Sequence, residues 1–179
     1  MQDNAQILNT VKASPKDAGA LKLIVLRLLG EQRRTAIKAQ ISSDNGVEGD
    51  RWGLKPDANP LSQVSLMNAR FLEAFAESPE RMSLAGDNLI IDFDISEANL
   101  PAGTRVRIGQ TVIEITDLPH TACKKLHGRY GKEATDLANS AEGMSLRLRG
   151  VYAKVVRGGE IRLGDKVHKE AAEPSGRIQ

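Results

Sequence analysis

One short segment of the chain, residues 118–129, concentrates the residue types that carry out chemistry. It holds the only cysteine, two of the three histidines and three basic side chains: Cys123, His120, His127, Lys124, Lys125 and Arg129. A thiol reacts, or binds a soft metal, as the thiolate, and neighbouring cations lower its pKa. The composition therefore predicts a reactive cysteine, in a loop that directly follows a strand.

Two other interpretations of this segment stand beside the reactive thiol. A single cysteine in an intracellular protein is more often a small buried apolar residue than a nucleophile. His120, Cys123 and His127 could instead ligate a metal. Structural zinc normally takes four ligands, however, and the sequence has no second cluster of Cys or His to supply the fourth.

Basic residues elsewhere in the chain could form an anion clamp with Lys124 and Lys125. Arg51 lies in a Gly-rich polar stretch, residues 42–60, and Arg147 and Arg149 precede a predicted strand. Guanidinium forks suit phosphate and other oxyanions, although such residues usually form just a solvated face. The sequence has neither a phosphate-binding loop nor a dinucleotide fingerprint, so ATP and nicotinamide cofactors have no recognisable site.

The segments that must position these residues have the pattern of short strands with glycine turns. Strands are predicted at residues 21–29, 35–41, 88–93, 104–108, 111–116, 151–156, 160–163 and 166–168. The spacing of Met67, Phe71 and Phe75 predicts an amphipathic helix over residues 67–78, and residues 132–141 are a second helix candidate. This pattern favours a mainly β fold with a few helices, of the barrel type, over a doubly wound sheet.

Length and composition indicate one domain. We place its core at residues 21–169 of the 179, with loose tails at 1–20 and 170–179. A net charge of +2 and 3% aromatic residues argue against a nucleic-acid partner. The single cysteine, the lack of a signal sequence and the lack of a long apolar run predict a cytoplasmic protein without a membrane segment.

Eight short motifs occur in a specific order along the chain. They are residues 47–53, 62–66, 85–89, 100–109, 114–116, 119–123 with Lys125 and Leu126, 149–155, and 159–165. In this order they resemble the MOSC family, the C-terminal domain of molybdenum cofactor sulfurases, from about Leu21 to His168. Two positions depart from the pattern: Asp87 stands where the family often has Glu, and Trp52 where many members have His.

The resemblance implies a MOSC-type β-barrel with a cofactor site. Cys123 matches the family's cysteine, which is thought to handle sulfur or to coordinate molybdenum in the pterin cofactor, molybdopterin. The expected cofactor-binding residues are Asp50, Arg51, Asp87, Asn88, Lys124, Arg147 and Arg149, with the arginines on a phosphate or oxyanion. Larger relatives add a cysteine desulfurase domain, which this chain lacks, so no pyridoxal phosphate site is expected.

Three functions follow, in this order of preference. The first is a standalone module that binds molybdenum cofactor, or carries sulfur for metal–sulfur centres, through Cys123, with a sulfur donor such as a cysteine desulfurase as partner. The second is a molybdenum-dependent reductase of N-hydroxylated compounds. Because the sequence has no flavin, haem or iron–sulfur motif, a separate reductase would supply its electrons. The third is a non-catalytic β-barrel interaction module in which Cys123 is buried and inert.

Overall fold

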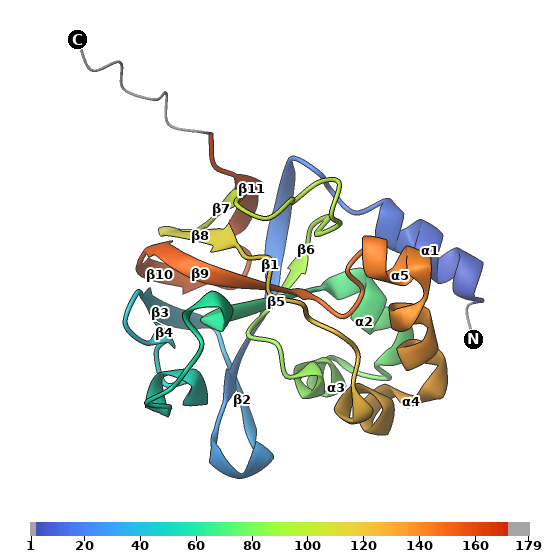
Figure 1. Cartoon of the computed structure of the whole chain (residues 1–179), viewed down its shortest axis with the longest axis horizontal. Coiled ribbons are helices and arrows are strands. Elements are labelled where there is room, and N and C mark those ends of the chain that lie inside the picture. Colours follow the sequence, from blue (N-terminus) through green and yellow to red (C-terminus); the bar gives the residue numbers. More distant parts are fainter. Residues whose placement is uncertain (1–2, 172–179) are drawn as a thin grey trace.

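The computed structural model describes residues 3–171, and seven strands of this part close into a barrel (Figure 1). They are β1 (Ala18–Arg27), β5 (Val64–Asn68), β6 (Leu89–Asp92), β7 (Arg105–Ile108), β8 (Thr111–Ile115), β9 (Val151–Arg157) and β11 (Lys166–Lys169). They pair in the order β11-β7-β8-β9-β5-β6-β1, and β1 pairs back with β11 to close the ring. The predicted mainly β barrel is confirmed.

The β7–β8 hairpin shows how the sequence pattern builds this barrel. Val106 pairs with Ile113 and is buried with it, whereas the neighbouring pair, Arg105 and Glu114, forms an ion pair at 3.3 Å. Gly109 makes the turn with a φ of 54°, in the left-handed region that glycine adopts without strain. The hairpin predicted over residues 104–116 is confirmed.

The strand predicted at residues 35–41 is instead two strands in different sheets. β2 (Arg33–Ala36) pairs with the end of β1, and β3 (Lys38–Ser42) pairs with β10 (Gly159–Arg162) and β4 (Gly46–Val47). Ile37, between them, is 76% exposed. The run of β-branched and polar residues continues through this position, so periodicity alone does not reveal the change of sheet.

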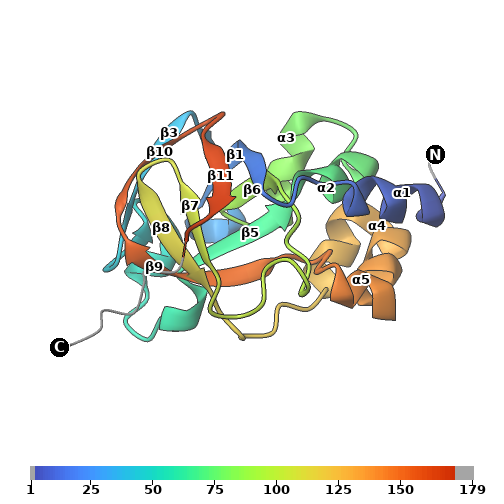
Figure 2. The ribbon, with the colours of Figure 1, turned by 90° about the horizontal axis from the view of Figure 1, so that it is seen from above.

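Five α-helices of the described residues gather on one side of the barrel, as Figure 2 shows. They are α1 (Asn4–Lys12), α2 (Ala69–Phe75), α3 (Pro79–Met82), α4 (Lys124–Asn139) and α5 (Ala141–Ser145). Short 3-10 turns lie at Leu29–Glu31, Arg51–Leu54, Pro60–Ser62 and Ser83–Ala85. No helix in residues 3–171 is long and apolar enough to cross a membrane.

Two apolar clusters hold the layers together. One fills the barrel and includes Leu66, Phe93 and Val167; the other lies between barrel and helices and includes Phe71 and Leu126. Each of these side chains is at most 1% exposed. Burial on this scale contributes about 1.5–3 kcal/mol per large side chain, so the second cluster fixes the helices against the barrel.

The chain ends differ from the tails that the sequence predicts. Residues 4–12 form a helix that begins with a capping box between Asp3 and Gln6 and buries Ile7 and Val11 against the helical layer. The prediction of a loose tail over residues 1–20 is therefore wrong for these residues. At the other end, Glu170 pairs with Arg107 at 2.6 Å, while residues 172–179 of the predicted tail lie outside the described part.

The helix candidate at residues 132–141 begins eight residues earlier than predicted. α4 starts at Lys124, directly after Cys123, and therefore includes much of the segment predicted as a loop. Gly131 interrupts it with a φ of 88°, and glycines lower helix propensity, which explains why the sequence pattern shows only its second half. The burial of Leu126 in the helical layer holds the first half in place.

Candidate functional site

A cavity of about 140 Å³ lies where strand ends of the barrel meet the start of α4. Its lining is Arg27 of β1, Arg33 of β2, Arg51, Ser65 of β5, Ala85, Gly86, His120, Cys123, Lys125 and Arg129 of α4, Arg149, and Tyr152 of β9. Six separate stretches of the sequence line this cavity, and together they bring six cationic side chains and the only thiol to one place. A cavity of this composition is suited to an anionic ligand.

Cys123 is exposed and occupies the N-cap position of α4. Partial burial opposes ionisation of its thiol, but the N–H groups of Leu126 and Lys125 and the charges of Arg149 and Arg129 outweigh this, so the pKa of Cys123 is lowered. An exposed thiol with a lowered pKa is what a nucleophile or soft-metal ligand requires, and the interpretation of Cys123 as a buried residue is wrong.

The floor of the cavity, which we define as Arg27, Asp50, Asn88, Asp87 and Arg149, is a set of buried polar groups. Asp50 accepts hydrogen bonds from Arg27 at 2.7, 2.8 and 3.0 Å and from Asn88 at 2.9 Å. Burial disfavours its charged form, yet the hydrogen bonds and charge of Arg27 outweigh this and lower the pKa of Asp50. Arg149 donates to Asp87 at 2.7 Å. The floor therefore carries paired charges.

His120 lies above the Asp87 end of the floor and stacks on Tyr152, with ring centroids 4.1 Å apart. Burial, together with the nearby cations Arg149 and Arg27, lowers the pKa of His120 to about 4, although Asp87 acts in the opposite direction. Its Nδ1 is 3.7 Å from Asp87 Oδ1, and neither atom has a hydrogen-bond partner within residues 3–171. His120 is thus a neutral wall of the cavity at physiological pH.

The rim cluster, which we define as Glu31, Arg33, Arg51, Lys125 and Arg129, has a different balance of charge. Glu31 Oε1 lies 2.5 Å from Lys125 and 3.6 Å from Arg51, and Oε2 lies 3.1 Å from Arg129 and 3.8 Å from Arg33. The hydrogen bond from Lys125 is the largest influence that lowers the pKa of Glu31. One carboxylate is shared by four cations.

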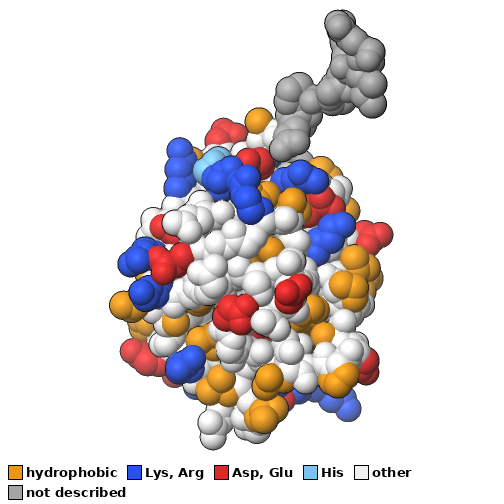
Figure 3. All heavy atoms as spheres, turned by 90° about the vertical axis from the view of Figure 1, so that its left-hand side faces the viewer, with side chains coloured by type: hydrophobic (Ala, Val, Ile, Leu, Met, Phe, Trp, Pro, Cys, Tyr) orange, Lys and Arg blue, Asp and Glu red, His pale blue; other side chains and the backbone are white. Residues whose placement is uncertain are grey.

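The face of the molecule in Figure 3 does not share the excess of cations that the rim cluster has. On the face that Figure 3 shows, Lys and Arg, Asp and Glu, and hydrophobic side chains are interspersed. The formal net charge of the chain is only +2. The excess of cations around Cys123 is therefore a local property of this site and does not reflect a generally basic protein.

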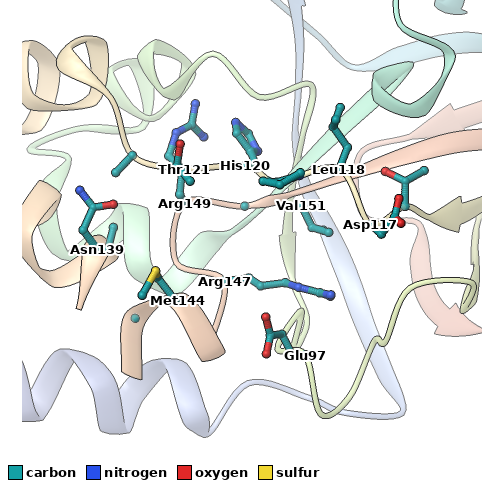
Figure 4. A pocket seen from close by; sticks show the side chains of 16 residues that line it. Glu97, Asp117, Leu118, His120, Thr121, Asn139, Met144, Arg147, Arg149 and Val151 are labelled. Atoms are coloured by element: carbon teal, nitrogen blue, oxygen red, sulfur yellow. The ribbon is translucent and has the colours of Figure 1, made fainter. Parts of the chain in front are cut away.

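A second cavity, of about 250 Å³, adjoins the first and shares His120 and Arg149 with it (Figure 4). Its other labelled walls include Asp117, Asn139, Met144 and Arg147. The Arg147 guanidinium donates to the carbonyl of Leu100 at 2.5 Å and is directed away from Cys123's cavity. The second cavity is less cationic, so it is suited to the neutral part of a ligand whose anionic end lies in the first.

Comparison with known proteins decides the family. Residues 41–168, more than two thirds of the chain, match the MOSC domain. The chain belongs to the MOSC family. No curated protein matches it.

Solved structures support the MOSC fold. The crystal structure of YiiM from Escherichia coli is similar, with a TM-score of 0.54, 19% identity, and coverage of 86% of this chain and 71% of that one. That of the YuaD protein from Bacillus subtilis has a TM-score of 0.56 and 12% identity, and covers 87% of this chain and 97% of that one. At these identities the likeness concerns the fold.

The structure brings together only part of the residue set expected from the MOSC resemblance. Cys123, Arg51 and Arg149 line the first cavity, and Asp50, Asp87 and Asn88 lie buried in its floor or directly behind it. Lys124 is exposed outside the cavity, whereas its neighbour Lys125 lines it, because consecutive helical residues point in different directions. Arg147 belongs to the second cavity.

Several residues of the site were not singled out from the sequence as cofactor-binding. They are Arg27, Arg33, Arg129, His120, Tyr152 and Glu31. Arg129 and His120 were noted only as neighbours of the cysteine in the sequence. Arg33 and Glu31 lie in a hairpin about 90 residues before Cys123, and no local pattern signals that contact. Residues 3–171 contain no group of three or more His, Cys, Asp or Glu side chains placed to hold a metal.

Proposed function

We propose that this MOSC protein binds the molybdenum cofactor, or carries sulfur for metal–sulfur centres, through Cys123. The observation that carries the proposal is an exposed thiol with a lowered pKa at the edge of a cavity lined by five arginines and a lysine. The thiolate is the form that ligates a soft metal or attacks a sulfur donor. The family itself is associated with the molybdenum cofactor.

The donor set fits the anionic part of that cofactor. Buried Nε atoms of Arg33 and Arg149 have no hydrogen-bond partner among residues 3–171, and a buried unpaired donor is unfavourable unless a ligand or water satisfies it. Arg51, Lys125 and Arg129 would hold the phosphate with them, while Asp50, Asp87 and Asn88 keep the arginines of the floor in position. Cys123 would be the protein ligand of molybdenum, which supplies two-electron chemistry when the cofactor is bound.

The two cavities together have a volume suited to a small-molecule ligand, whereas the first cavity alone is too small. Ligand sites for small molecules usually measure about 300–1,000 Å³, and the first cavity alone, at about 140 Å³, is smaller. The adjoining cavity, at about 250 Å³, shares His120 and Arg149 with it. A ligand with an anionic end and a neutral body would extend past these two residues from one cavity into the other.

In the sulfur-carrying form of the proposal, Cys123 needs no metal. Its thiolate would attack the terminal sulfur of a donor persulfide, so that a Cys123 persulfide forms and the donor leaves as a thiolate. A cysteine desulfurase is the class of partner that provides such a donor. The cations near Cys123 favour both the attacking thiolate and the anionic persulfide that results.

A molybdenum-dependent reductase of N-hydroxylated compounds is the second candidate, and the adjoining cavity favours it. That cavity is an open space next to the proposed metal ligand in which a neutral substrate could lie. The reaction takes two electrons and two protons and releases an amine and water, and a separate protein would supply the electrons. Turnover of an N-hydroxylated base with an artificial donor would separate this candidate from carriage.

The decisive experiment is to purify the protein from a host that makes molybdenum cofactor, and to measure molybdenum, oxidised pterin and intact mass. Cys123→Ser and Arg129→Gln are compared with Arg157→Gln, a matched control whose side chain is 55% exposed and pairs with Glu170 outside both cavities. Metal, pterin or an added sulfur in the wild type and control, lost from Cys123→Ser, supports the proposal. A folded wild type that carries none of them rejects stable carriage.

A further inference from the structure

The hairpin between β1 and β2 places one carboxylate against the cations of the site. Glu31 contacts Arg33, Arg51, Lys125 and Arg129, all of which line the first cavity, although Glu31 itself does not line it. Its side chain is 50% exposed. The carboxylate therefore lies at the mouth of the cavity, in contact with water.

These four cations share one carboxylate partner in the described part of the chain. Among residues 3–171, Glu31 is the only carboxylate within 4 Å of the four, whereas the two remaining cavity arginines, Arg27 and Arg149, have their own aspartates. Arg33 is the most enclosed of the four, with a side chain only 6% exposed and an Nε without a partner. The cluster has more cationic charge and more hydrogen-bond donors than Glu31 satisfies.

The backbone holds Glu31 in an unusual conformation to make these contacts. Gly30 and Glu31 have φ values of 69° and 62°, and a left-handed conformation is disfavoured for a residue with a side chain. The neighbouring Leu29 is 72% exposed, and a Cβ at Gly30 would meet nothing within 4 Å. No packing therefore holds the tip of this hairpin, which projects from the barrel in Figure 1. The N–H of Leu28 donates to the carbonyl of Gln32 at 2.9 Å across the base of this tip, and the contacts of Glu31 to the cations are additional to that hydrogen bond.

We propose that Glu31 is an internal stand-in for the anionic group of the ligand, which a phosphate-class oxyanion displaces when it enters the cavity. The hairpin tip then acts as a gate that selects for ligands with enough negative charge to compete with Glu31. This inference deepens the proposed function, because it concerns the same cavity, but it needs no molybdenum. A carboxylate provides one charge and two acceptor oxygens, fewer than a phosphate offers to the same four cations.

Charge-selective alkylation of Cys123 tests the gate. Cys123 is the only cysteine, so intact mass reports its modification by iodoacetate, which is anionic, and by iodoacetamide, which is neutral and corrects for the thiolate fraction. In Glu31→Gln the ratio of the iodoacetate rate to the iodoacetamide rate should rise about tenfold, because the cavity loses its competing anion. Inorganic phosphate should protect the variant at about tenfold lower concentration than the wild type.

The matched control is Glu160→Gln on β10. Glu160 also pairs with two cations, Lys38 and Arg162, but lies outside both cavities. The Glu160→Gln variant should have the same ratio of iodoacetate to iodoacetamide rates, and the same protection by phosphate, as the wild type. If Glu31→Gln changes them no more than Glu160→Gln does, the gate is rejected. Molybdenum content is measured separately, so loss of the gate and loss of cofactor binding are distinguishable.

Discussion

The floor and the rim cluster of the same cavity use charge in opposite ways. In the floor each carboxylate is almost fully buried and has an arginine of its own, as Asp50 has Arg27. At the rim a half-exposed Glu31 is shared by four cations. Removal of one partner from a buried pair leaves an unpaired charge in a poorly solvated place, whereas water and salt replace an exposed one. We therefore expect the floor to stabilise the fold and the rim to bind ligand.

The largest effect should come from Asp50→Ala. The Asp50 side chain is 1% exposed and accepts hydrogen bonds from Arg27, Asn88 and the N–H of Trp52. The substitution leaves the Arg27 guanidinium buried without a counter-charge, so the free energy of unfolding should fall by about 3–5 kcal/mol. Urea denaturation followed by circular dichroism measures it.

Asp44→Ala is the control for that change, since Asp44 is exposed in the same stretch between β3 and the 3-10 turn at Arg51–Leu54. It should alter the free energy of unfolding by less than about 0.5 kcal/mol. A loss below about 1 kcal/mol for Asp50→Ala would show that the floor behaves like a surface pair, and the contrast with the rim would fail.

The next largest effect is a dependence of stability on pH that comes from His120. Its pKa is about 4 in the folded protein against 6.5 for an ordinary histidine, because burial disfavours the charged ring. As pH falls below 6.5 the unfolded chain takes up a proton that the folded protein does not, so stability is lost between about pH 6.5 and pH 4. The free energy of unfolding should be about 2 kcal/mol lower at pH 5 than at pH 7.5.

His120→Gln should remove most of that pH dependence, whatever it does to stability at pH 7.5. Asp50 and Asp94, whose pKa values are lowered by their hydrogen-bonded partners despite burial, lose their contributions only below their ordinary pKa of 3.8, outside this range. If the free energy of unfolding of the variant still falls as steeply between pH 7.5 and pH 5, a group other than His120 causes the pH dependence.

The sequence predicts features that depend on neighbouring residues better than contacts between residues far apart in the chain. Most of the barrel strands, including the β7–β8 hairpin, follow from local periodicity, because alternation and glycine turns are properties of neighbouring residues. Cys123, Arg51 and Arg149 were singled out from their residue types and neighbours in the sequence, and the MOSC motifs then implied their role in cofactor binding. The part of Glu31 in the rim cluster was missed because Glu31 and Arg129 lie 98 residues apart and meet only through the path of the hairpin. Helix α1 was missed because it has only three large apolar residues, Ile7, Leu8 and Val11, in an otherwise polar stretch.

A smaller effect should appear in the titration of Cys123. Arg129 is one of the charges that lower the pKa of the thiol, after the N–H groups of the first turn of α4. In Arg129→Gln the midpoint of the alkylation rate by iodoacetamide against pH should therefore move upward. Arg157→Gln should not move it. A midpoint unchanged in both variants would mean that the helix terminus and Arg149 set the reactivity without Arg129, and the rim cluster would have no part in the chemistry.

The smallest effect on stability should come from Glu31→Gln, and this is the sharpest test of the comparison. Glu31 contacts four cations where Asp50 contacts one, so a tally of ion pairs would make it the more important carboxylate. Its exposure leads to the opposite expectation, because water replaces the lost contacts and repulsion among the cations is screened by salt. The urea midpoint should match the wild type at physiological salt. A clearly lower urea midpoint for Glu31→Gln would show that Glu31 is needed to hold the hairpin in place and is not a displaceable anion.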